Sequence, residues 1–238
     1  MNRKELEEIL EKNSDPGFRE FNLKITPYSG KMYGVRMPVI RSIAKDIAKG
    51  DWRAFMEEES GSFEQSMIRA LLVATAEMDG QERLERLSGF IPEVDNWAVC
   101  DLLCGSFRID SEDTYSELWH MCTGLLDTGK EFPMRVGAVM MLNHFIDGRH
   151  ADDVIGLMCT VPGSGYYYDM AAAWALSYCY IAYPEKTEDR MFRECASMTI
   201  LRMAVRKIRE SYRVGSADKE RVKGKLKDIA ARSRRSRP

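Results

Sequence analysis

The stretch Phe132-Pro-Met-Arg-Val-Gly-Ala-Val-Met-Met-Leu142 decides the fold class of this chain. It is apolar almost throughout, and Arg135 is its only charged residue. Pro133 stands near its beginning, where helices tolerate proline best. Apolar residues continue at helical spacing beyond the stretch, so we predict a buried helix over residues 133–146.

The same helical spacing recurs along nearly the whole chain, whereas alternating runs of β-branched residues, which are typical of strands, are absent from the sequence. Residues of the N-capping type stand before several apolar segments, and we predict that Ser62, Asp95, Ser111 and Asp169 begin helices. Among the later segments, residues 198–212 form a predicted helix. About a dozen helices with short connections follow, which makes the predicted class all-α.

Long apolar helices around Phe63, Trp97, Arg135 and Trp174 follow one another at intervals of about 34 to 39 residues. Such an interval is typical of HEAT-like helical pairs, which stack into an α-solenoid superhelix with a concave face. A plain helical bundle would give the same pattern of helices. We predict one HEAT-like domain over residues 1–232 and a frayed basic tail over residues 233–238.

Composition and charge limit the classes of protein to which this chain can belong. The chain has 238 residues, of which 45% are hydrophobic and 30% charged, so disordered, collagen-like and small disulfide-rich classes are excluded. The net charge is only −2, but it is distributed unevenly. Residues 202–238 hold 14 Lys and Arg against 4 Asp and Glu, which leaves 21 basic and 33 acidic residues before them. The basic end is either a phosphate-binding surface or a solvated helix with a tail.

Cysteine and histidine usage indicates neither a metal site nor a disulfide framework. The six cysteines form no Cys-x-x-Cys pair, and the three histidines have no metal-ligand spacing. The charged beginning of the chain lacks the apolar core of a signal peptide. We therefore expect a cytoplasmic protein that needs no cofactor or metal, has no membrane segment and acts as a monomer.

One group of four residues suggests a catalytic site. Trp97 and Asp101 stand four residues apart, which places an aromatic ring and a carboxylate on the same helix face. Arg135 stands near the start of the next long apolar helix, and Trp174 lies in the one after it. If these helices are neighbours, the four side chains converge. Each residue alone has an ordinary interpretation as a core or surface residue.

Five strings stand in order along nearly the whole chain: Gly34-Val-Arg-Met-Pro-Val-Ile-Arg41, Val94-Asp-Asn-Trp-Ala-Val-Cys-Asp101, Arg135-Val-Gly-Ala-Val-Met-Met-Leu-Asn-His-Phe-Ile-Asp147, Tyr166-Tyr-Tyr-Asp-Met-Ala-Ala-Ala-Trp174 and Arg206-Lys-Ile-Arg-Glu-Ser-Tyr-Arg213. With these strings the sequence resembles the DNA alkylation repair family of HEAT-like-repeat DNA glycosylases, of the AlkD type. The resemblance implies a superhelix that holds duplex DNA and excises bases alkylated at ring nitrogens, such as 3-methyladenine and 7-methylguanine. It also implies that Trp97 and Trp174 are cleft aromatics, that Asp101 is the catalytic carboxylate and that Arg135 contacts phosphate.

Further phosphate contacts are expected near the end of the chain. Arg202, Arg206, Arg209 and Arg213 recur at spacings of four, three and four, as one stripe on a helix that the family places along DNA. Lys207 and Arg36 are additional candidates, with Arg41 beside them. Two other functions remain open at this point: a non-catalytic HEAT-like module that binds damaged or branched DNA, and a protein-binding scaffold.

Overall fold

The computed structural model describes residues 2–26 and 28–235, and for residues 232–235 it describes the backbone alone. Helices account for all the regular structure in these ranges, and no strand occurs in them. The helices are α1 (Arg3–Lys12), α2 (Pro16–Ile25), α3 (Met37–Ala48), α4 (Trp52–Met56), α5 (Phe63–Thr75), α6 (Gly80–Phe90), the 3-10 turn η1 (Ile91–Glu93), α7 (Trp97–Ser106), α8 (Glu112–Leu126), α9 (Glu131–His144), α10 (Ala151–Thr160), α11 (Tyr166–Ala182), α12 (Pro184–Glu194), α13 (Met198–Glu210) and α14 (Ser216–Arg235). The all-α prediction is confirmed.

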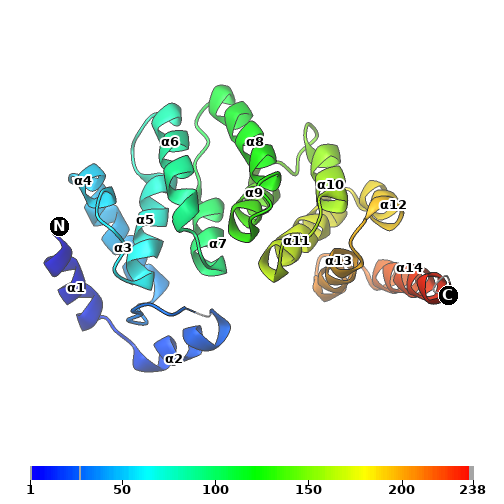
Figure 1. Cartoon of the computed structure of the whole chain (residues 1–238), viewed down its shortest axis with the longest axis horizontal. Helices are drawn as coiled ribbons and strands as arrows, with labels where there is room; N and C mark the ends of the chain where they lie inside the picture. Colours follow the sequence, from blue (N-terminus) through cyan, green and yellow to red (C-terminus); the bar gives the residue numbers. More distant parts are fainter. Residues whose placement is uncertain (1, 27, 236–238) are drawn as a thin grey trace. The chain divides into compact units, whose positions relative to one another are not determined.

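The chain divides into two compact units, Met1–Leu118 and Trp119–Pro238, and α8 contains the boundary. In the first unit α5 packs against α3 and α7, while α4 packs against α3 and α6 packs against α5 (Figure 1). Helices that are two apart in chain order, namely α3, α5 and α7, therefore lie side by side. This arrangement is expected for successive helical pairs. The apolar side chains of α5, from Ile68 to Ala74, are almost inaccessible to solvent and form the centre of this core.

The second unit repeats this packing around α11. Helices α9 and α13 both pack against α11, which also contacts α10 and α12, and α14 lies against α12 and α13 (Figure 1). Alanines at 171–173 and 175 are fully buried, and their small side chains let the neighbouring helices approach α11 closely. Both units thus have the alternating helix contacts of a helical-repeat protein, which is the fold class predicted from the sequence.

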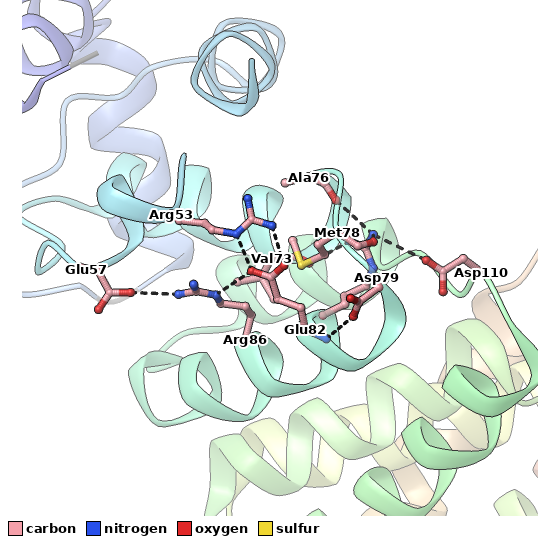
Figure 2. A network of polar contacts seen from close by, with 10 residues as sticks. Arg53, Glu57, Val73, Ala76, Met78, Asp79, Glu82, Arg86 and Asp110 are labelled. Carbon is pink, nitrogen blue, oxygen red and sulfur yellow. Dashed lines mark hydrogen bonds and ion pairs between the residues drawn. The ribbon is translucent and has the colours of Figure 1, made fainter. Parts of the chain in front are cut away.

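Buried and half-buried arginines hold the first unit together (Figure 2). Arg83 of α6 donates hydrogen bonds to the carbonyls of Val73 and Ala76, so it satisfies carbonyl groups at the end of α5. Burial lowers the pKa of its guanidinium. Arg53 of α4 forms a bidentate ion pair with Glu82 of α6, and its hydrogen bonds lower the pKa of Glu82. These contacts fix α4, α5 and α6 relative to one another.

Two helix starts differ from the sequence-based expectation. Helix α7 begins at Trp97, and its cap is Asn96 rather than Asp95, because the Asn96 side chain accepts the Val99 N–H at 3.0 Å. Helix α11 begins at Tyr166, one turn before the predicted start beside Asp169. Its first turn is satisfied from α9 instead, since the Glu131 carboxylate accepts the Tyr167 N–H at 2.6 Å. The predicted caps Ser62 and Ser111 are confirmed by bonds from the N–H groups of residues 65 and 114.

Two further differences concern the ends of the chain. Helix α2 was not predicted, although Asp15 caps it and Pro16 occupies its first position. Helix α13 ends at Glu210, two residues earlier than predicted, because Ser211 adopts an extended backbone conformation. The tail predicted to fray comprises residues 233–238. Helix α14 includes the backbone of residues 233–235, and residues 236–238 lie outside the described part.

Within the described ranges, no helix combines the length and the apolar character needed to cross a membrane. The same ranges contain no group of three or more His, Cys, Asp or Glu side chains arranged to bind a metal ion. The six cysteines, all within the described ranges, are thiols and not disulfides, and five of them are buried.

Candidate active site

A cleft of about 380 Å³ opens in the first unit between α2, α3, α5 and α7. Most of its wall is apolar, and its polar side chains are few. The apolar residues are Phe18, Val35, Met37, Phe63, Met67, Trp97, Ala98 and Leu102, and the polar ones are Asn22, Thr26, Arg41 and Asp101. A concave apolar site with a small number of polar groups is the usual form of a ligand-binding site.

Trp97 and Asp101 lie one turn apart on α7 and both line this cleft, as their spacing predicted. Both residues are partly exposed. The indole Nε1 of Trp97 donates a hydrogen bond of 3.0 Å to the carbonyl oxygen of Ile25, the last residue of α2. That bond fixes the orientation of the indole ring and ties the end of α2 to α7.

The wall formed by α3 is positioned by a buried carboxylate. Glu64 of α5 is inaccessible to solvent and accepts backbone N–H groups from Tyr33, Gly34 and Val35, the shortest at 2.7 Å. Gly34 has a φ of +81°, and a side chain there would meet the backbone oxygen of Asp15. Glycine is therefore required where the segment before α3 passes the start of α2.

Arg36 immediately precedes α3 and is not among the residues that line the cleft. Its Nη2 contacts Asp15 Oδ2 at 2.8 Å, and its guanidinium lies 4.5 Å from the centre of the Phe18 ring. The Phe18 N–H, together with Arg36, lowers the pKa of Asp15. The predicted phosphate contact of Arg36 would therefore compete with Asp15, whereas Arg41 lines the cleft itself.

A second cleft of about 380 Å³ lies in the second unit and is lined in part by Trp174, Tyr178, His144 and Arg213. The Trp174 and Tyr178 rings meet edge to face with their centres 6.0 Å apart. Lys207 Nζ stands 5.6 Å from the centre of the Trp174 ring, and the Arg213 guanidinium 4.7 Å from that of Tyr178. Both distances allow cation–π attraction, so this cleft combines aromatic faces with positive charge.

Arg135 is buried, whereas a side chain that contacts phosphate has to be accessible at the surface. It is only 4% exposed, and its Nη1 donates to the carbonyl oxygen of Tyr167 at 2.7 Å. Since Glu131 accepts the N–H of the same tyrosine, two residues of α9 hold the first turn of α11. Arg135 is absent from the walls of both clefts described above.

The predicted stripe of arginines is present over most of its length. Arg202, Arg206 and Arg209 are exposed on α13, and Arg206 is paired with Glu210 at 2.8 Å. Arg213 is not part of the helix, because it follows the end of α13, and it faces Tyr178 instead. The structure thus brings Trp97 together with Asp101 in one unit, and Trp174 together with Lys207 and Arg213 in the other. The convergence of these two groups remains a prediction.

Several residues of the two clefts have only a weak signal in the sequence, or none. Phe18 and Asn22 belong to α2, whose only clear signal was the Asp15-Pro16 pair at its start. Tyr178 had no distinguishing signal, since a tyrosine in an apolar helix usually belongs to the core.

The fold and the clefts define an all-α helical-repeat protein with an aromatic and carboxylate cleft in one unit and aromatic and basic side chains in the other. Residues 6–208 match the model of a protein family described as DNA alkylation repair enzyme. The chain therefore belongs to this family, and membership implies that DNA is its substrate. Among curated proteins and solved structures, none matches the chain.

Proposed function

We propose that the protein is a DNA glycosylase of the AlkD type that excises cationic alkylated purines, such as 3-methyladenine and 7-methylguanine, from duplex DNA. The observation that carries the proposal is the position of Asp101, which lines an apolar cleft beside Trp97 in a chain of the DNA alkylation repair enzyme family. The reaction is hydrolysis of the N-glycosidic bond, and its products are a free base and an abasic site.

Asp101 has the appropriate chemistry for this step. A purine alkylated at a ring nitrogen already carries a positive charge, so it leaves with the bonding electron pair without needing a proton from a general acid. The sugar then develops oxocarbenium character at C1′, and a carboxylate nearby stabilises that charge. At about 4 Å the attraction amounts to roughly 4 kcal/mol for an effective dielectric near 20, or about three orders of magnitude in rate. Asp101 also orients the water that adds to C1′.

The aromatic residues have a supporting role in this proposal. The faces of Trp97 and Trp174 attract a cationic base or sugar, with a gain of about 0.5–2 kcal/mol each. Lys207 already stands over the Trp174 ring. A cationic base that binds at that face would take the place of the Lys207 ammonium. Arg135 contributes by holding α9 to α11 through Tyr167, and a direct phosphate contact requires its guanidinium to become accessible.

The first experiment measures release of 7-methylguanine and 3-methyladenine from methylated duplex DNA without added metal. We expect release by the wild type and a loss of at least about 100-fold in Asp101→Asn, because the amide keeps the shape of the side chain and removes its charge. Binding of intact duplex should change little. Asp95→Asn is the matched control, since Asp95 is exposed and lies outside the cleft wall.

Other outcomes would favour the remaining functions. A folded wild type that binds duplex DNA but releases no base would be a non-catalytic module for damaged or branched DNA. If duplex binding is also absent at low salt, the protein-binding scaffold becomes the better interpretation. Loss of folding in Asp101→Asn, seen by circular dichroism, would make Asp101 a structural residue.

A further inference from the structure

Two cysteines of the second unit, Cys159 and Cys195, lie near each other although they are 36 positions apart in the sequence. Cys159 belongs to the last turn of α10, and Cys195 immediately follows α12. The N–H of Ala196 donates to the carbonyl oxygen of Cys159 at 2.9 Å, which holds the two backbone segments side by side. Their thiols are close enough for each to influence the pKa of the other. No part of the proposed glycosylase reaction uses this pair.

The two thiols have different environments. Cys159 is 1% exposed, whereas Cys195 is accessible in part and stands two residues before the first turn of α13. The Cys195 thiol donates to the carbonyl oxygen of Ser197 at 3.4 Å, and its contact with Cys159 holds its pKa below the ordinary value. The same contact, together with burial, raises the pKa of Cys159. Cys195 is therefore the member of the pair that solvent reaches and that ionises more easily.

A partly accessible cysteine that ionises easily, with a second cysteine in contact, is the arrangement of a peroxide-sensitive dithiol. The remaining buried cysteines differ from this pair. Burial raises the pKa of Cys122, and it raises the pKa of Cys179 to about 12, so both remain protonated and inert at neutral pH.

We propose that Cys159 and Cys195 form a reversible disulfide when the protein meets hydrogen peroxide. The thiolate of Cys195 attacks one peroxide oxygen, the O–O bond breaks, and Cys195 becomes a sulfenic acid while hydroxide leaves. The sulfur of Cys159 then attacks the sulfenic sulfur, loses its proton, and the sulfenic oxygen leaves as water. Two electrons pass from the thiols to the peroxide, and a dithiol such as dithiothreitol returns them.

The disulfide would join the end of α10 covalently to the segment before α13, the helix that carries Arg202, Arg206 and Arg209. A cross-link across the intervening residues restricts the unfolded chain, so the oxidised protein should unfold at a higher temperature than the reduced one.

The test treats fully reduced protein with stoichiometric peroxide, alkylates the remaining thiols in denaturant and locates disulfides by tryptic mass spectrometry. We expect four alkylated cysteines instead of six, and a peptide containing Cys195 linked to the peptide containing Cys159. Cys179 lies in that same peptide, so Cys179→Ser is the matched control and should retain the link.

Variants of the pair separate the two steps. Cys195→Ser should prevent both the disulfide and the rise in unfolding temperature, and because Cys195 is partly accessible this variant should fold. Cys159→Ala should stop the reaction at a sulfenic acid on Cys195 that dimedone traps. Six alkylated thiols after peroxide treatment of the wild type, or a link that survives in Cys159→Ala, would overturn the proposal. These outcomes are independent of base release.

Discussion

At the scale of single residues, Trp97 combines a position in the cleft with a structural bond. Its indole N–H donates to the Ile25 carbonyl at 3.0 Å, so the ring that faces Asp101 also holds the end of α2. Trp97→Phe keeps an aromatic ring but removes the donor. We expect a loss of about 0.5–1.5 kcal/mol in the free energy of unfolding, measured with urea, and faster hydrogen exchange in α2. An unchanged exchange rate in α2 would mean that other contacts hold this helix.

Gly34 gives a second prediction at this scale, because both its backbone and its surroundings exclude a side chain. Its φ is +81°, and a Cβ would collide with the backbone oxygen of Asp15. Gly34→Ala should destabilise the protein by at least about 1–2 kcal/mol in urea unfolding. Gly89→Ala is the control, since Gly89 lies in α6 with open space around it, and this change should stabilise by about 0.5–1 kcal/mol.

At the scale of elements, a buried carboxylate of α12 contributes to the attachment of α14, which also packs against α13. Glu188 of α12 is 5% exposed and accepts hydrogen bonds from Arg221, Lys225 and Tyr180. Burial alone would raise the pKa of Glu188, but the bonds from Arg221 and Lys225 outweigh it and lower the pKa to about 2. Two of the three partners belong to α14, so the charge of Glu188 anchors this helix.

The pH dependence of this anchor has a definite sign. The pKa in the folded protein lies below the ordinary value of 4.5, so the stabilisation is fully present above pH 4.5 and is lost as the pH falls toward 2. Glu188→Gln should cost about 2–3 kcal/mol at pH 7, a figure reduced from the full shift because Arg221 and Lys225 are half-exposed. The difference from the wild type should shrink near pH 2. Urea unfolding across this range, with exposed Glu185→Gln as control, measures it.

Buried helices are readily predictable from the sequence, whereas helices at the surface are less so. Long apolar helices such as α5, α9 and α11 were predicted because their burial forces apolar residues to recur at helical spacing. Helix α2 was missed because it buries no residue completely and leaves Phe21 and Ile25 about half exposed. A helix at the surface of a unit has no such constraint on its pattern, so only its cap identifies it. Two cleft residues, Phe18 and Asn22, were missed with it.

At the scale of the whole molecule, the candidate site is predictable from the sequence only where it depends on the geometry of a single helix. The pairing of Trp97 with Asp101 depends only on helix geometry, and the structure agrees with it. The contacts of Lys207 with Trp174 and of Arg213 with Tyr178 depend on how separate helices pack, which spacing along one helix does not determine. The same is true of Arg135, whose bond to the Tyr167 carbonyl joins two helices.

The uneven charge of the chain leads to the last prediction, which concerns DNA binding by the protein as a whole. Residues before 202 are acidic in sum, so attraction to a polyanion must come from the basic end of the chain. Arg206 and Arg209 are exposed on α13, and neither lines the cleft that contains Asp101. Replacing both by alanine should weaken duplex binding regardless of sequence and reduce the salt slope by about 1–2, since up to two phosphate contacts disappear.

The same double variant should separate binding from chemistry. Under saturating protein and with one turnover, base release should proceed at nearly the wild-type rate, because the charge of Asp101 is unchanged, whereas Asp101→Asn should lower the rate with binding intact. Lys4→Ala with Lys12→Ala on α1 removes the same charge from the other unit and serves as the control. If this control flattens the salt slope equally, net charge rather than α13 governs the attraction. If the slope stays at the wild-type value in the arginine variant, these two side chains are not phosphate contacts.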